Sequence, residues 1–133
     1  MALLVWVRNI GVNLNIGGIS VSNSVALSFQ NVTKKFGGLT AVDKVNFEIR
    51  DNEVFGLIGP NGSGKTTVLD LVSGLLRLSS GKIISYDKKI SGKTSAQIAR
   101  RGVSRTFQLV RMLPTLNVKE NIASGGVFGF RRY

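Results

Sequence analysis

The sequence contains neither cysteine nor histidine among its 133 residues. Without cysteine the chain forms no disulfide framework and no thiolate metal site, and nothing in it demands an oxidising compartment. Without histidine it lacks imidazole acid–base chemistry and the commonest zinc ligand. The length predicts about one domain, and the hydrophobic share of 43% is ordinary for a globular protein.

Acidic residues are scarce, with seven Asp and Glu against 18 Lys and Arg, so the formal net charge is +11. A basic surface attracts polyanions, which makes a nucleic acid or an anionic membrane a candidate partner. The cations are spread along the chain, however, without the interleaved aromatic residues on which single-strand binders stack bases. We therefore interpret the excess as a solvated basic face and expect no nucleic-acid partner.

The first 24 residues have little charge, since Arg8 is their only charged side chain. The apolar run 2–7 is far shorter than the about 20 residues that span a bilayer. No basic region precedes it, as one would in a signal peptide. We interpret residues 1–24 as a loosely ordered N-terminal extension, with a short extra strand as the alternative.

A glycine-rich turn followed by a lysine is the most informative feature of the chain. Its residues are Gly59, Pro60, Asn61, Gly62, Ser63, Gly64, Lys65, Thr66 and Thr67. The order matches the phosphate-binding pattern G-x-x-x-x-G-K-[ST] in full. The apolar run 54–58 before it predicts a buried strand, and the run after it predicts a helix to about Leu76. This is the strand, loop and helix context that the motif requires.

Phosphate chemistry explains this spacing. Closely placed glycines let backbone N–H groups curl around a phosphate, and a helix that begins near Gly64 points its positive end at the same anion. Lys65 can reach the β and γ phosphates, while the hydroxyl of Thr66 is placed to bind Mg²⁺. We expect Thr67 to hold the α-phosphate. The sequence therefore predicts a nucleotide-binding site.

Period-two alternation of apolar residues predicts two half-buried antiparallel strands, at 25–30 and 45–49, with a turn at Gly37 and Gly38. Further strands are predicted at 83–86 and 103–107.

Two more helices are indicated by their first residues. Thr94 is a predicted N-cap for a helix that ends at Gly102, and Asn117 with Glu120 has the spacing of a capping box.

Residues 25 to about 123 resemble the N-terminal half of an ABC transporter ATP-binding subunit. The nine loop residues are similar to the phosphate loop of that family. The runs Phe36-Gly37-Gly38-Leu39-Thr40-Ala41-Val42 and Arg105-Thr106-Phe107-Gln108 resemble its branch that energises branched-chain amino-acid uptake. The resemblance implies an α/β fold, a P-loop NTPase core of ABC type, in which antiparallel β strands lead into a parallel sheet. It places the N-terminal part of the ATP-binding domain at 25–133, ending before the signature turn and the Walker B strand.

The resemblance also assigns residues outside the loop. Phe36 lies where the family has the aromatic residue that stacks on adenine, and Val42 lines the same pocket; the alternative is that Phe36 is a core residue at a strand end. Gln108 matches the glutamine that contacts Mg²⁺ or its water, for which an amide carbonyl is a suitable hard ligand. The implied cofactors are ATP and Mg²⁺, with Thr66 and Gln108 as metal ligands.

Departures from the family pattern concern hydrolysis. The family uses an aspartate at a strand end and an adjacent glutamate, whereas the only acidic residue after Gln108 is Glu120. The run Ser124-Gly125-Gly126 lacks the leucine and glutamine of the signature turn, and we interpret it as a coincidence. We therefore expect no catalytic residue in this chain, which leaves its own ATPase activity uncertain, and we expect marginal stability when the chain is isolated.

The function implied by the resemblance is that of a cytoplasmic ATP-binding subunit of an importer, peripheral on the inner face of the cell membrane. The expected solute is a branched-chain amino acid, although other subunits set that specificity. The expected partners are ABC transmembrane subunits and a second ATP-binding subunit. Two alternatives stay open: a soluble ABC-type ATPase without a transport role, and a basic nucleic-acid-binding module.

Overall fold

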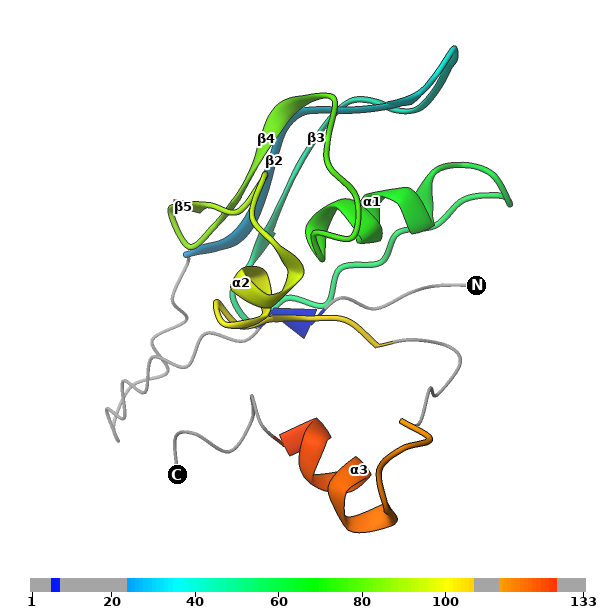
Figure 1. The fold of residues 1–133 in the computed structure, drawn as a ribbon. Coiled ribbons are helices and arrows are strands. Elements are labelled where there is room, and N and C mark those ends of the chain that lie inside the picture. The colour runs from blue at the N-terminus through cyan, green and yellow to red at the C-terminus, as the bar shows by residue number, and fades with distance from the viewer. Residues whose placement is uncertain (1–5, 8–23, 107–112, 127–133) are drawn as a thin grey trace, which may run out of the picture.

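The computed structural model describes residues 6–7, 24–106 and 113–126. Its largest element is a four-stranded antiparallel sheet in the order β3-β2-β4-β5 (Figure 1). The strands of this sheet are β2 (Val25–Phe36), β3 (Leu39–Arg50), β4 (Ser80–Ser85) and β5 (Lys88–Lys89). A second antiparallel pair joins β1 (Trp6–Val7) to β6 (Val103–Ser104). The helices are α1 (Lys65–Val72), α2 (Ser95–Ala99) and α3 (Val118–Gly126).

The β2–β3 hairpin confirms the two predicted antiparallel strands and the turn between them. Phe36 pairs with Leu39 at its end, and Gly37 has a φ of 55°, a conformation that glycine adopts without strain. The prediction that β2 is half-buried is wrong for its first part, where Ala26 and Ser28 are buried along with the residues that alternate with them. The reason is that β2 lies between β3 and β4, and the hydroxyl of Ser28 is hydrogen-bonded by neighbouring polar side chains.

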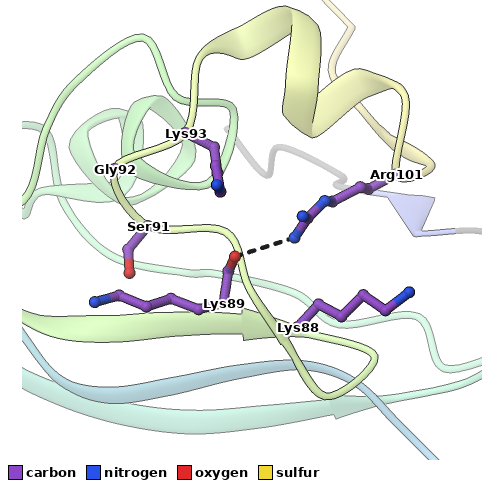
Figure 2. Close-up of a pocket in the computed structure, with 6 residues that line it drawn as sticks. All are labelled: Lys88, Lys89, Ser91, Gly92, Lys93 and Arg101. Carbon is purple, nitrogen blue, oxygen red and sulfur yellow. Dashed lines mark hydrogen bonds between the residues drawn. The ribbon is translucent and has the colours of Figure 1, made fainter.

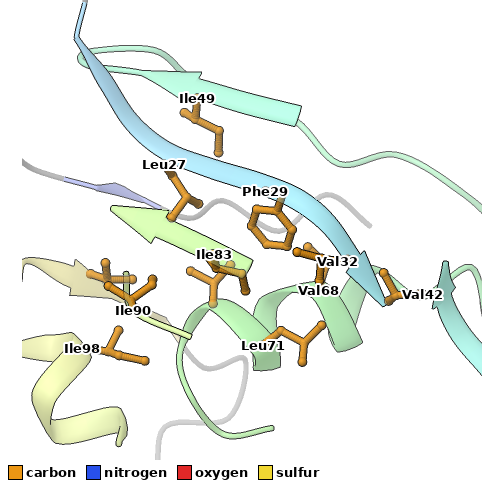
Figure 3. Close-up of a cluster of buried hydrophobic side chains, with 12 residues drawn as sticks. Leu27, Phe29, Val32, Val42, Ile49, Val68, Leu71, Ile83, Ile90 and Ile98 are labelled. Carbon is orange, nitrogen blue, oxygen red and sulfur yellow. The ribbon is translucent and has the colours of Figure 1, made fainter. Parts of the chain in front are cut away.

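The hydrophobic core lies between this sheet and α1 (Figure 3). Phe29 from β2 and Ile83 from β4 are no more than 2% exposed. α1 buries Val68, Leu69, Leu71 and Val72. The amphipathic helix thus covers one face of the sheet, as the apolar spacing after the glycine-rich loop predicts.

The prediction of a buried strand at 54–58 is wrong for the described structure. These residues are assigned to no strand, and the side chains of Val54 and Ile58 are 78% and 91% exposed. Phe55 and Leu57 are half-buried against the core, and Phe55 stacks on Phe47 with ring centroids 4.9 Å apart. The run therefore uses one of its faces for packing, while no strand of the described residues pairs with its backbone.

Several predicted boundaries also need correction. α1 ends at Val72 rather than near Leu76, because Gly74 takes a φ of 70° and turns the chain. Tyr86 lies in the turn after β4 rather than in the strand. β6 ends at Ser104, and Phe107 lies outside the described residues.

Other local predictions are confirmed. Thr94 forms a complete capping box with Gln97 at the start of α2. Asn117 and Glu120 exchange the two hydrogen bonds of a second capping box, at 2.9 and 3.0 Å. Within residues 1–24 the structure has the short strand β1, which was the alternative interpretation, and residues 1–5 and 8–23 are outside the described part. Among the described residues no helix is both long and apolar enough to cross a membrane.

Candidate functional site

The glycine-rich loop leads directly into α1. Gly64 is the N-cap of this helix, no side chain caps it, and no acidic residue lies in its first turn. The first N–H groups of an α-helix have no intrahelical acceptor, and the helix dipole places positive potential at this end. The start of α1 is therefore a favourable position for an anion.

Two glycines of the loop take backbone conformations that other residues rarely adopt. Gly62 has a φ of 82° and Gly64 a φ of 85°. A Cβ atom on Gly64 would lie 2.5 Å from the carbonyl oxygen of Ala41, whereas a Cβ on Gly62 would meet nothing within 4 Å. The loop thus packs against the first residues of β3, and Gly64 allows that close approach.

The ammonium group of Lys65 folds back over the loop. Its Nζ donates to the carbonyl oxygens of Gly59 and Pro60, both at 2.6 Å, and to Oγ of Ser63 at 3.2 Å. These acceptors are neutral, so a phosphate oxygen would replace them with a charged partner and a stronger hydrogen bond. The lysine is already positioned at the mouth of the loop before any phosphate arrives.

Thr66 and Thr67 follow in the first turn of α1, where Thr66 is exposed and Thr67 half-buried. Among the described residues no group of three or more His, Cys, Asp or Glu side chains could hold a metal ion. The hydroxyl of Thr66 is a hard oxygen donor of the kind that Mg²⁺ accepts, and Mg²⁺ commonly takes its other ligands from phosphates and water. The residues present fit a metal that arrives with a nucleotide.

The two predicted adenine contacts have different environments. Phe36 lies at the end of β2, is 44% exposed, and has Nζ of Lys34 4.8 Å from its ring centroid. Val42 is only 5% exposed and packs near Gly64. The structure therefore brings Val42 to the loop but buries it, while Phe36 keeps an accessible surface. Gln108 lies outside the described residues.

An ion pair between Arg105 and Asp70 was not apparent from the sequence. Arg105 follows β6, and Asp70 lies in α1 on the same helical face as Thr66, four residues earlier. Both side chains are largely buried, at 14% and 22% exposure. The pair fixes the chain after β6 beside α1. Thirty-five positions separate the partners, so no local spacing could have indicated it.

These features are the glycine-rich loop with its left-handed glycines, the lysine that follows it and the helix start that no side chain caps. Together they define a P-loop nucleotide-binding protein of the α/β class. The family model described as ABC transporter matches residues 42–131. The chain therefore belongs to the ABC transporter family, as the sequence resemblance indicated.

Curated relatives refine this assignment. The chain is 45% identical over 96 residues to the high-affinity branched-chain amino acid transport ATP-binding protein LivG of Escherichia coli K12, a match that covers 72% of this chain and 38% of that protein. It is 39% identical over 108 residues to the spermidine/putrescine import ATP-binding protein PotA of Rubrobacter xylanophilus, covering 81% of this chain and 27% of that protein. The match to LivG thus spans well under half of that relative.

Solved structures agree with the fold. An ATP-binding cassette of an ABC transporter superposes with a TM-score of 0.61 at 32% identity, covering 66% of this chain and 35% of that one. A dimeric ATP-binding cassette in a post-hydrolysis state, bound to ADP and Pi, gives a TM-score of 0.61 at 26% identity, covering 80% of this chain and 49% of that one. The predicted P-loop fold of ABC type is confirmed.

Proposed function

We propose that this chain is the nucleotide-binding part of an ATP-binding subunit that energises an ABC importer for branched-chain amino acids. The observation that carries the proposal is the complete phosphate loop at the uncapped start of α1, with Lys65 folded over it. The identity to LivG supports the solute class, and the weaker likeness to a polyamine importer subunit supports the same activity with another solute.

In this proposal the backbone N–H groups of the loop residues 59–64 other than Pro60 surround the β-phosphate, and Lys65 exchanges its loop carbonyls for β and γ oxygens. Thr67 contacts the α-phosphate. Thr66 donates its hydroxyl oxygen to Mg²⁺, whose charge would offset that of the phosphates when it is bound. The chain's own contribution is to position the phosphates and to neutralise their charge.

Gln108 is proposed as a second metal ligand because the sequence run from Arg105 to Gln108 resembles that of the family. Its amide oxygen is a hard ligand of the kind that Mg²⁺ accepts. The residue itself lies outside the described part of the chain.

Phe36 is proposed to stack on adenine, with Val42 supporting the loop from behind rather than lining the base. Stacking requires that Nζ of Lys34 leave the face of the Phe36 ring or that adenine use the opposite face. Turnover is expected only from a longer chain with the hydrolytic carboxylates of the family. Membrane subunits and a second ATP-binding subunit are the proposed partners, at the cytoplasmic face of the membrane.

The test is ATP–Mg²⁺ binding by the wild-type chain, the Lys65→Ala variant and a Lys82→Ala control. Lys82 is an exposed lysine on β4, so its removal changes the net charge equally. Lys65→Ala should weaken ATP binding at least about tenfold, because a charge-assisted hydrogen bond contributes about 1.5–3 kcal/mol. Lys82→Ala should leave it unchanged. Equal affinities in all three proteins would refute the proposal.

The transport role needs its own experiment. The complete protein in which this sequence occurs should hydrolyse ATP and co-purify with ABC membrane subunits when they are expressed together. ATP hydrolysis without such a complex would support the soluble ATPase instead. Salt-sensitive binding of DNA or RNA that survives Lys65→Ala would support the nucleic-acid module.

A further inference from the structure

A second concentration of positive charge lies away from the phosphate loop, between β5 and α2. Here an open pocket of about 540 Å³ is lined by Lys88, Lys89, Ser91, Gly92, Lys93 and Arg101 (Figure 2). We call it the β5–α2 pocket. Four of its six lining residues are cations and none is an acid, so the lining has a charge of +4. Cations that line one pocket repel one another, and an anion bound among them would offset that repulsion.

The acidic residues of the chain are engaged elsewhere or lie outside the pocket. Asp70 pairs with Arg105, and Asp51 accepts hydrogen bonds from Ser24 and Tyr86. Asp87, which precedes Lys88, is exposed in the β4–β5 turn and is not among the lining residues. In residues 24–106 and 113–126, no ion pair involves any of the four pocket cations.

The frame of the pocket is held by buried residues and main-chain bonds. Ile90, which follows β5, and Ile98 of α2 belong to the hydrophobic core, at 0% and 1% exposure. The N–H of Ile90 donates to Ile83 O at 2.9 Å, which ties the residue after β5 to β4. A tight turn follows, in which Lys93 N–H donates to Ile90 O at 3.0 Å. The positions from which the cations project are therefore fixed by the fold.

Figure 2 shows that the side chains of Lys93 and Arg101 point toward each other across the pocket. The side chains of Lys88 and Lys89 extend in opposite directions from β5. One guanidinium nitrogen of Arg101 donates to the carbonyl oxygen of Lys89 at 3.0 Å, which orients the group and leaves its other donors available. A guanidinium with free donors and neighbouring ammonium groups is the combination that recognises phosphate oxygens.

We propose that the β5–α2 pocket binds a ligand that presents two or more phosphate groups close together. One phosphate carries up to about two negative charges near neutral pH, so two phosphates match four cations. The volume lies within the range of about 300–1,000 Å³ that small-molecule sites occupy. A free polyphosphate and the clustered headgroups of an anionic lipid surface offer the same chemistry, and the experiment separates them.

The test measures inorganic tripolyphosphate binding in a Lys65→Ala background, which weakens binding at the phosphate loop. The pocket variant is Lys88→Gln with Lys93→Gln, two exposed side chains whose replacement leaves the fold intact. The matched control replaces Lys82 and Lys119, two exposed lysines outside the pocket, by Gln. The pocket variant should bind about tenfold more weakly for each cation removed, and the control should bind as its parent does.

A parallel arm uses phosphatidylcholine vesicles with and without phosphatidic acid, assayed by co-sedimentation. Loss of vesicle binding in the pocket variant, with tripolyphosphate binding too weak to measure in its parent, would assign the site to lipid headgroups. If the pocket variant and the control behave alike in both arms, or if Lys65→Ala alone abolishes all phosphate binding, the proposal is overturned. The comparison of the pocket variant with its control is made entirely in the Lys65→Ala background and does not depend on whether Lys65 binds ATP, so the proposed function and this inference fail separately.

Discussion

The sheet formed by β2, β3 and β4 contrasts with the segment 54–64 that follows it. In the sheet, Leu27, Phe29 and Ile83 are buried, and β2 is paired with a strand on each side. In the segment, Val54 and Ile58 face outward, and Lys65 after it donates to carbonyl oxygens of the loop. The centre of the sheet is thus packed within the described residues, whereas the segment exposes apolar side chains beside the phosphate loop.

The difference shows that one chain can combine a well-packed sheet with a segment whose apolar side chains are exposed. The two meet where Gly64 packs on Ala41, so the phosphate loop takes its position from the stable sheet. Four predictions probe this contrast.

The largest effect is expected from a cavity in the sheet. Ile83 is fully buried, so Ile83→Ala should lower the free energy of unfolding by about 2–5 kcal/mol. Ile58→Ala removes the same atoms from a side chain that is 91% exposed and should change it by no more than about 0.5 kcal/mol. Urea titrations followed by circular dichroism compare the two. Equal losses would mean that residues 54–58 are part of the core and that the contrast is wrong.

The second prediction concerns the contact between the phosphate loop and β3, which substitutions of the loop glycines test. Gly64→Ala combines a left-handed φ with a clash against Ala41 O, and we expect it to cost about 2–4 kcal/mol. Gly62→Ala has a similar φ but no atom within 4 Å, so only the conformational cost of about 1–2 kcal/mol applies. Thermal unfolding measures the gap between them. A Gly62 variant as unstable as the Gly64 variant would show that the close approach to β3 is unimportant.

How much of the fold and of the candidate site could be predicted depends on how far apart in the sequence the interacting residues lie. The phosphate-loop pattern, the N-cap Thr94 and the capping box of Asn117 with Glu120 depend on residues within a few positions of one another, and the sequence predicted them. The run 54–58, in which Val54 and Ile58 face outward, was predicted as a buried strand, because an apolar run does not reveal whether partner strands lie beside it.

The ion pair of Arg105 with Asp70 could not be predicted, because it joins positions 35 apart. The β5–α2 pocket could not be predicted for the same reason, because its lining residues are separated in the sequence. Lys88 and Arg101 were interpreted as members of a solvated face, since only the folding of β5 against α2 brings them together. Sequence patterns thus do not determine which residues far apart in the chain come into contact.

A polar cluster at the end of the sheet gives a pH-dependent prediction. The phenol of Tyr86 donates to the buried carboxylate of Asp51 at 2.5 Å, and burial together with this bond and the nearby negative charge raises the pKa of Tyr86. Because an unfolded tyrosine titrates near about 10, the stabilisation is fully present below that pH and is lost as the pH rises above it. Tyr86→Phe should cost about 1.5–3 kcal/mol at neutral pH, as a hydrogen bond to a charged group does.

The measurement for Tyr86 is the free energy of unfolding at pH values from neutral to above 10. The difference between wild type and the Tyr86→Phe variant should shrink at the alkaline end. A difference that stays constant with pH would show that Asp51 does not govern the titration of Tyr86.

The smallest effect on stability is expected when the outward apolar residues are replaced. Such substitutions should instead reduce the association of the chain with itself. Val54→Thr with Ile58→Thr should change the free energy of unfolding by no more than about 0.5 kcal/mol, since both side chains are already in water. Light scattering at raised concentration should nevertheless fall, because contiguous exposed apolar groups promote association. If stability dropped instead, these residues would be buried in solution. Unchanged stability with lower scattering would locate the association-prone surface of the chain beside its phosphate loop.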